Sequence, residues 1–431
     1  MATRTGQRLH QLRDGLVQKR GEELAFVVSN AIVNVANFAF FVAVGRFFDP
    51  SSYGAISALL SIVTVANTPL NAIQAGVVHA TVVVRHALGE SSPRRVTAWF
   101  ALVGIAMTAA VAAASGFLEH FFTIADYVPV LMLALWFAPS VINSALCGSL
   151  MGHFRFRAIA VANVVGALFR IVLVVCFGFA DHVFGLAGPI LATSAGISVT
   201  TVWVFVAVRR EPSWRVGAPL EIHLSQTMWA FVSLAGFATF VALDVILARH
   251  LLPAAIAGNY AVASTTGKIA LFLSVAVPIV AYPRFAAHRT ARTSAHHELL
   301  VSLAIVVFLG VVAAGVMALL PHFWISLLFG HRYSTSPSIL RILAPEGAAM
   351  GVVGLFTYYH VAQRSLLAFV PWLGVAAVAI TMAAEHLRAH DLALLMLASA
   401  LVVSVVMAIP ALVTRTRIPL APDTTSHDGP S

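Results

Sequence analysis

Residues 258–282, GNYAVASTTGKIALFLSVAVPIVAY, decide the fold, because they form a long apolar stretch in which Lys268 is the only charge. A helix that crosses a bilayer needs about 20 mostly apolar residues, so this stretch is long enough to span a membrane. Lys268 is one of two lysines in the chain. A charge at the centre of a membrane helix costs about 2.5–3.5 kcal/mol, so we expect Lys268 to hold a partner or a ligand.

The rest of the chain has the same character. Hydrophobic residues make up 60% of the 431 residues and charged residues 10%, which excludes an ordinary soluble domain. Cys147 and Cys176 fall inside apolar segments without metal-ligand spacing, so we expect no cofactor and no bound metal. The sequence predicts an all-α polytopic membrane protein with twelve transmembrane helices, at residues 24–47, 54–84, 96–117, 128–151, 158–180, 185–208, 227–249, 257–282, 299–322, 338–362, 366–384 and 391–413.

Basic residues gather at both ends of the chain and in alternate loops. Such residues stay on the cytoplasmic side of short loops, so the alternation predicts that both termini are cytoplasmic. The net charge of +9 then belongs mostly to a face that meets anionic lipids, and it requires no nucleic acid. The preference for arginine over lysine indicates a bacterium of high G+C content, and we expect the protein in its inner (cytoplasmic) membrane. The residues are Arg4, Arg8, Arg13, Lys19, Arg20, Arg85, Arg94, Arg95, Arg155, Arg157, Arg209, Arg210, Arg215, Arg284, Arg289, Arg292, Arg364, Arg415 and Arg417.

A polar linker, RREPSWRVGAPLEIHLSQ, divides the predicted spans into two sets of six. Each half begins with a helix whose outer end reads Arg-x-x-x-Pro, from Arg46 to Pro50 and from Arg249 to Pro253. Snorkelling arginines and helix-starting prolines explain one copy, whereas two copies at matching places favour a repeat. Both halves begin from the same side, so the repeat is parallel, and a site for alternating access is expected between the halves. The predicted regions are a basic tail (1–23), an N-terminal lobe (24–208), the linker (209–226), a C-terminal lobe (227–413) and a second tail (414–431).

Two stripes of amide side chains lie inside the first two spans. Each has a spacing of four and three residues, which puts its members on one face of a helix. Single asparagines in membrane helices often bind a neighbouring helix, but two stripes on adjacent helices favour a wet cavity that binds sugars. The stripes are Asn30, Asn34 and Asn37 in the first span and Asn67, Asn71 and Gln74 in the second, where His79 follows towards the cytoplasm.

Lys268 has two open interpretations. In one, it pairs with Asp244 and locks the seventh and eighth spans together. In the other, which we favour because the two residues are predicted at different depths, Lys268 and Arg170 form a cationic centre. Cations in a low-dielectric cavity bind phosphate oxygens strongly, so such a centre would hold a ligand phosphate or pyrophosphate.

Asp244 lies about one turn from the outer end of the seventh span, and its role is also open. As a gate, its carboxylate would pair with a cation in one conformation and be released in the other, because a switch must make different contacts in its two states. The alternative is a static salt bridge to Arg249 or to outer head groups. We group Asp244 with Glu346 and His79 as candidates for coupling or gating.

The segment from Phe240 to Arg284, FVALDVILARHLLPAAIAGNYAVASTTGKIALFLSVAVPIVAYPR, resembles the seventh and eighth helices of polysaccharide-type flippases in the multidrug/oligosaccharidyl-lipid/polysaccharide exporter superfamily. The turn GRFFDPSSYGAISAL resembles its counterpart in the N-terminal half. The resemblance implies a V-shaped pair of six-helix lobes that moves a polyprenyl-linked saccharide from the cytoplasmic to the outer leaflet. In that family lumenal basic residues engage the lipid-linked phosphate or pyrophosphate, and Lys268 and Arg170 are the candidates by depth rather than by a motif match. Glycosyltransferases of the same pathway are candidate partners. The driving force stays open between H+, Na+ and the removal of product.

Two other classes of protein fit the sequence less well. Cation-coupled multidrug antiporters of the same superfamily usually carry an acidic residue within the first span, where this chain has only the amide stripe. An enzyme needs a nucleophile–base pair, a phosphate loop or paired carboxylates at one depth, and the sequence offers none of these. We therefore expect a transporter rather than an enzyme, with the antiporter as the alternative function.

Overall fold

The computed structural model describes residues 25, 28–88, 91–211, 214, 218–219, 224–290, 295–384 and 388–413. In this part of the chain, twelve helices are long and apolar enough to cross a membrane, and they coincide with the twelve predicted spans. The prediction of an all-α, multi-pass membrane protein is confirmed. The predicted tails, 1–23 and 414–431, lie outside the described residues, as does much of the predicted linker.

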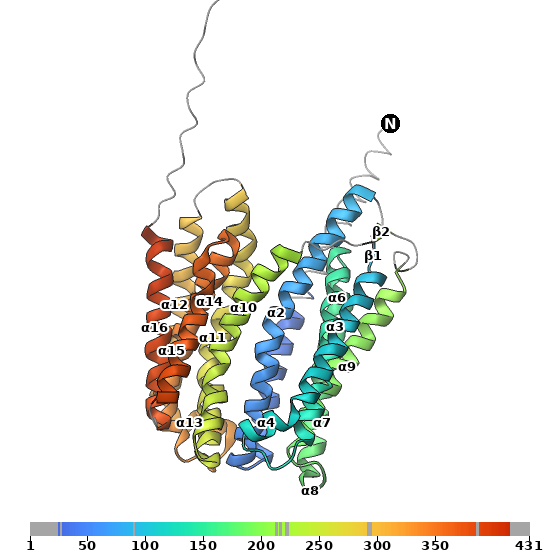
Figure 1. Cartoon of the computed structure of the whole chain (residues 1–431). Coiled ribbons are helices and arrows are strands. Elements are labelled where there is room, and N and C mark those ends of the chain that lie inside the picture. Colours follow the sequence, from blue (N-terminus) through green and yellow to red (C-terminus); the bar gives the residue numbers. More distant parts are fainter. Residues whose placement is uncertain are drawn as a thin grey trace, which may run out of the picture.

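The N-terminal lobe holds the first six spans, coloured blue to green in Figure 1. Its second span begins at Pro50, whose fixed φ suits the first helical position. The Asp49 carboxylate caps this helix by accepting hydrogen bonds from the backbone N–H groups of Ser51 (2.9 Å) and Ser52 (3.3 Å). The helices are the first span (Val28–Phe47), α2 (Pro50–Leu88), α3 (Arg94–Ala113), α4 (Ser115–Phe121), α5 (Val128–Ala134), α6 (Phe137–Gly152), α7 (Phe156–Phe179), α8 (Asp181–Phe184) and α9 (Ala187–Arg209).

The C-terminal lobe repeats this order, with the short α13 after its third span where the N-terminal lobe has α4. The parallel repeat of two six-helix lobes is therefore confirmed. A pair of two-residue strands, β1 (Ser91–Ser92) and β2 (Ala218–Pro219), runs in parallel at the end of the N-terminal lobe. The helices are α10 (Leu224–Leu251), α11 (Ala254–Thr290), α12 (His296–Leu319), α13 (Pro321–Phe329), α14 (Ser336–Gln363), η2 (Leu366–Phe369), α15 (Val370–Ala384) and α16 (Ala389–Val413).

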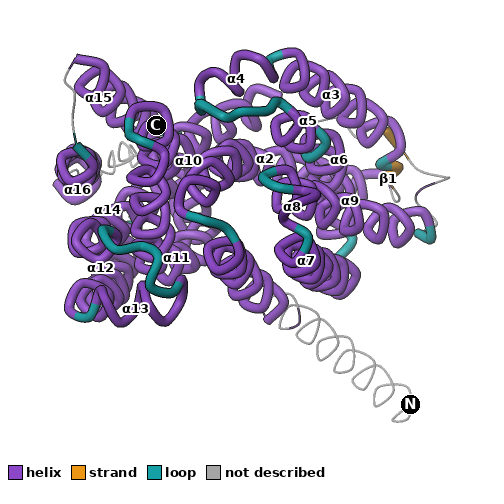
Figure 2. Tube along the Cα trace, turned by 90° about the horizontal axis from the view of Figure 1, so that it is seen from below, coloured by secondary structure: helices purple, strands orange, loops and turns teal. Residues whose placement is uncertain are grey.

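The molecule has two distinct ends across the predicted membrane. Twelve crossings put Val28 and Val413 on one face, which we name the terminal face. The opposite face, which we name the distal face, carries the short helices α4, α8 and α13 (Figure 1); Figure 2 looks onto this face. The arginine pattern predicts that the terminal face is cytoplasmic.

Two glycine contacts bring helices unusually close together. Gly258 at the start of α11 lies against Pro50 at the start of α2, so that a Cβ at Gly258 would overlap the Pro50 carbonyl. Gly347 of α14 likewise meets the backbone carbonyl of Gly267 in α11. Only a residue without a side chain permits such approaches. The first contact joins the two lobes at the distal face, and the second brings the middle of α11 against α14.

Candidate functional site

Two arginines at equivalent positions of the sequence repeat join the lobes at the distal face. Arg46, at the end of the first span, donates from Nε (2.8 Å) and from Nη2 to two carbonyls in the last turn of α13. Arg249, near the end of α10, donates from Nε to the carbonyl of Phe122 (2.9 Å) and from Nη2 to that of Thr123 (3.0 Å), directly after α4. Each arginine thus satisfies carbonyls that the end of a helix leaves without intrahelical partners, and each does so in the opposite lobe.

Aromatic side chains complete this contact. The Tyr333 hydroxyl donates to the carbonyl of Gly45 (2.9 Å), and the Tyr53 hydroxyl donates to Oγ1 of Thr265 (3.1 Å). The buried rings of Tyr53, Tyr333 and Phe329 meet edge to face, with centroids 5.8, 5.9 and 6.1 Å apart. Together with the two arginines, these side chains form what we call the distal seal, which holds the lobes together at the distal face.

Lys268 forms an ion pair rather than standing free. Its Nζ lies 2.9 Å from Oδ1 of Asp244, and their side chains are 12% and 0% exposed. Ser264, one turn before Lys268, donates to the other carboxylate oxygen. This is the ion pair between the seventh and eighth spans that the first interpretation of Lys268 predicts. A role of Lys268 in binding a ligand phosphate stays a prediction. A static bridge from Asp244 to Arg249 is wrong, because Arg249 binds carbonyls instead.

Side-chain direction explains why the predicted difference in depth did not separate this pair. Asp244 lies seven residues before the end of α10, about 10 Å, and Lys268 fourteen residues after the start of α11, about 21 Å. Helical side chains tilt towards the N-terminus of their helix. Because α10 and α11 run in opposite directions, Asp244 tilts towards the terminal face and Lys268 towards the distal face. The long lysine stem spans the remaining distance.

Glu346 of α14 adds a second carboxylate to this group of side chains, which we call the C-lobe cluster. Glu346 is 2% exposed, and neither its Oε1 nor the Tyr260 hydroxyl has a hydrogen-bond partner among the described residues. The charges of Asp244 and Lys268 act on Glu346. Since Asp244 already neutralises Lys268, Glu346 must hold a proton or meet another cation, because an unpaired buried charge is costly.

Arg170 of α7 has a different environment in the N-terminal lobe. Its Nη2 donates to Oδ1 of Asn37 in the first span (2.9 Å), and its guanidinium lies 4.1 Å from the centre of the Phe40 ring. Its Nε is buried without a hydrogen-bond partner, and no carboxylate of the described chain pairs with it. An amide and a ring orient the guanidinium without neutralising it. Arg170 therefore remains the candidate for binding an anion.

The other predicted amides lie at the surface of the first span and α2. Hydrocarbon is a poor solvent for amides, so we expect the exposed ones to face a hydrated space between the lobes. Gln74 is half-buried and donates from Nε2 to Sδ of Met151 (2.8 Å). No group of metal-binding side chains is present in the described part of the chain. The exposed residues are Asn30, Asn34, Asn67, Asn71 and His79.

Comparison with known sequences identifies the family. A model of the family described as polysaccharide biosynthesis protein matches residues 43–337. The chain belongs to this family. No curated protein matches it in sequence.

Solved structures show which fold the chain shares. A multidrug resistance MATE family transporter of the MOP superfamily, in an inward-facing conformation, has a TM-score of 0.72 at 15% identity, over 91% of this chain and 99% of that chain. An outward-facing conformation has a TM-score of 0.56 at 14% identity, over 90% and 93%. The lipid II flippase MurJ, in an inward closed conformation, has a TM-score of 0.65 at 11% identity, over 91% and 88%. The two-lobed helical fold that the resemblance to the exporter superfamily implies is confirmed.

Some residues that contribute to these sites were not predicted from the sequence. Phe40 follows Asn37 by three residues and so shares its helix face, which was a usable signal for a ring beside Arg170. Ser264 precedes Lys268 by four residues and carried the same signal. The carbonyls that accept hydrogen bonds from Arg249 carried no signal, because every residue has a carbonyl and only the packing of the lobes selects three of them.

Proposed function

We propose that the protein is a flippase. It moves a saccharide linked to a polyprenyl phosphate or pyrophosphate from the cytoplasmic to the outer leaflet of a bacterial inner membrane. The observation that carries this proposal is Arg170, whose charge no described carboxylate neutralises. A lipid phosphate supplies the missing negative charge through charge-assisted hydrogen bonds. The exposed amides of the first span and α2 supply partners for sugar hydroxyls.

The distal seal supports alternating access as the mechanism. It joins the lobes at the distal face, whereas Asn30 and Asn34 lie near the terminal end of the first span. With the terminal face cytoplasmic, this conformation takes its substrate from the cytoplasmic leaflet. Release to the outer leaflet then requires Arg46 and Arg249 to leave their carbonyls.

Replacing Arg249 tests this mechanism. Arg249→Ala removes hydrogen bonds to the N-terminal lobe, so we expect the outward-open population to increase about tenfold. A single cysteine at the buried position Ser57, in a background with Cys147→Ser and Cys176→Ser, should then be labelled faster from outside. Arg388→Ala, at an exposed arginine directly before α16 and outside the seal, serves as the control. Equal labelling in both variants would contradict the mechanism.

We propose the C-lobe cluster as the coupling site for H+ or Na+. Its titratable groups come from three helices: Asp244 of α10, Tyr260 and Lys268 of α11, and Glu346 of α14. A proton or Na+ at Glu346 compensates the second carboxylate, and its release changes the charge between these helices. A ligand shifts a conformational equilibrium only when its affinity differs between the two states, so α10 and α14 must separate or approach during the cycle.

The same cluster favours one rival, a cation-coupled multidrug antiporter. The two functions differ in what crosses the membrane. The flippase should move a fluorescent polyprenyl-pyrophosphate saccharide between the leaflets of proteoliposomes, and its deletion should leave lipid-linked saccharide on the inner leaflet. Absence of both effects, together with protection of cells from cationic dyes, would replace the flippase with the antiporter. Glycosyltransferases encoded beside the gene are the partners that we expect for the flippase.

A further inference from the structure

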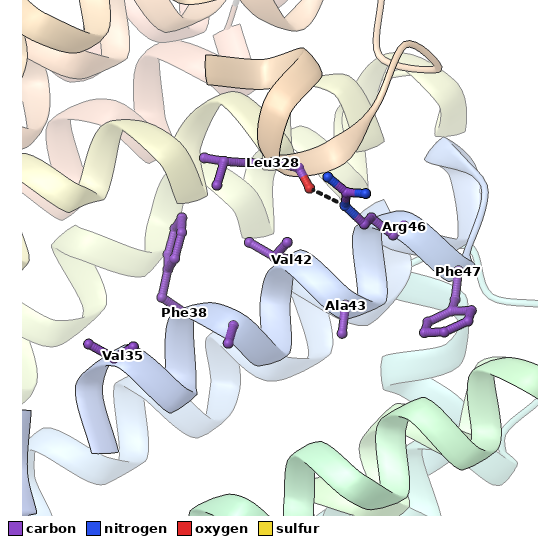
Figure 3. A pocket seen from close by; sticks show the side chains of 8 residues that line it. Val35, Phe38, Val42, Ala43, Arg46, Phe47 and Leu328 are labelled. Atoms are coloured by element: carbon purple, nitrogen blue, oxygen red, sulfur yellow. Dashed lines mark hydrogen bonds between the residues drawn. The ribbon is translucent and has the colours of Figure 1, made fainter. Parts of the chain in front are cut away.

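An apolar groove follows the first span to Arg46 (Figure 3). The groove has a volume of about 640 Å³ and is lined by hydrocarbon side chains, among them Val35 and Val42, apart from Arg46. Phe38 and Val42 point towards Leu328 of α13, and Arg46 lies where the first span reaches the distal face. The groove therefore lies at the seam between the lobes, with one cation at its distal end.

Arg46 has donors to spare for a ligand. A guanidinium carries five N–H donors, and the two carbonyls of α13 engage Nε and Nη2 only. The side chain is exposed. An anion at the end of the groove can thus bind Arg46 without breaking its contact with α13, and charge-assisted bonds to phosphate are stronger than bonds to neutral carbonyls.

Arg249 shows that this arrangement is not a general property of the repeat. It occupies the equivalent position, yet it is 5% exposed and spreads Nε, Nη1 and Nη2 over three carbonyls. It does not line this groove. Each half therefore contributes one arginine to the distal seal. Only Arg46, in the N-terminal half, also keeps N–H donors that a ligand can use.

We propose that the groove binds the polyprenyl chain of the lipid-linked substrate, with its phosphate on Arg46. This inference rests on the proposed function. A saccharide that crosses between the lobes needs its chain to remain in hydrocarbon, and a groove at the seam offers that path. Arg46 lies nine residues beyond Asn37, the partner of Arg170, or about 13 Å further along the first span. Arg46 is thus a second phosphate-binding residue, nearer the outer leaflet than Arg170.

Native mass spectrometry of the detergent-solubilised full chain tests this site. Undecaprenyl phosphate, undecaprenol and phosphatidylglycerol are offered at equal concentrations, in a background carrying Arg170→Gln so that Arg46 is measured alone. We expect preferential retention of undecaprenyl phosphate. Arg46→Gln should weaken its binding about tenfold but leave undecaprenol unchanged, because one charged hydrogen-bond donor is lost. Arg46→Lys should retain part of the effect.

Two further variants keep the test decisive. Val42→Trp fills the groove and should weaken binding of the phosphate and the alcohol alike, whereas Arg388→Gln, an exposed arginine directly before α16 and outside the groove, should change neither. Wild-type binding by both Arg46→Gln and Val42→Trp would overturn the site. Equal retention of phosphatidylglycerol would also overturn it, since the groove would then hold ordinary bilayer lipid.

The outcome is separable from that of the proposed function. If saccharide lipid is flipped while binding ignores Arg46 and Val42, only the groove assignment fails. If binding depends on both residues and no saccharide lipid is flipped, the flippase proposal fails and the isoprenoid phosphate site stands.

Discussion

The two lobes surround their half-buried cations, Lys268 and Arg170, with different neighbours. In the C-terminal lobe, Lys268 is neutralised by Asp244, and Ser264 occupies the other carboxylate oxygen. In the N-terminal lobe, Arg170 has a neutral amide and a ring as its neighbours and no carboxylate within the described chain. The first arrangement is complete without a ligand, and the second is not. The difference separates a cation that holds helices together from one that can bind an anion.

Removing Lys268 should have the largest effect, and that effect is on stability. Lys268→Ala leaves Asp244 buried and unpaired, which costs about 3–5 kcal/mol. We expect a much lower melting temperature in detergent micelles, and Lys268→Met combined with Asp244→Leu should recover most of it. Arg341→Ala, an exposed arginine in α14, provides the control. An unchanged melting temperature for Lys268→Ala would show that the ion pair is not structural.

Removing Arg170 should reduce the rate of flipping without lowering stability. Arg170→Ala deletes a cation that has no counter-charge, so we expect the melting temperature to stay at the parent value or rise. The rate of flipping in proteoliposomes should fall about 100-fold, because charged hydrogen bonds to phosphate contribute about 1.5–3 kcal/mol. Arg170→Lys should retain part of the rate. A stable, fully active Arg170→Ala variant would remove the phosphate role.

Glu346 sharpens the comparison, because it is the one carboxylate of the C-lobe cluster without a cation. Glu346→Gln mimics the protonated side chain, so flipping should lose its dependence on pH and ion gradients, with a loss of rate of about tenfold. Glu298→Gln is a matched control, since Glu298 is a carboxylate on α12 that pairs with Arg284 (3.2 Å). A Glu346→Gln variant that still responds to pH like the parent would place coupling elsewhere.

Asn37 should give the smallest effect. Asn37→Ala removes one neutral hydrogen bond that orients Arg170, worth about 1 kcal/mol, and leaves the Phe40 contact in place. We expect flipping to slow about fivefold with the dependence on pH unchanged. A loss as large as that of Arg170→Ala would instead mean that Asn37 contacts the substrate itself.

The sequence predicted some residues of the candidate site but not the contacts between them. Arg170 and Asn37 were both identified as functional candidates, but no pattern joined them, because the two residues lie 133 positions apart in the sequence. The ion pair of Lys268 with Asp244 was not the favoured interpretation, because depth was counted along helix axes, whereas side chains tilt and reach. The Arg-x-x-x-Pro repeat was recognised in the sequence. The carbonyls in the opposite lobe that accept hydrogen bonds from Arg46 and Arg249 were not predicted.

The sequence by itself determined the twelve spans and the parallel repeat, because hydropathy and motif spacing are local properties of the chain. Only the tertiary structure decided which charges are compensated. That choice depends on how α10 and α11 rotate and tilt, and on carbonyls that the lobes expose to Arg46 and Arg249. A side chain is fixed by its position in the sequence, but its partner is fixed by packing, and a shift of a few ångströms decides between an ion pair and an open cation.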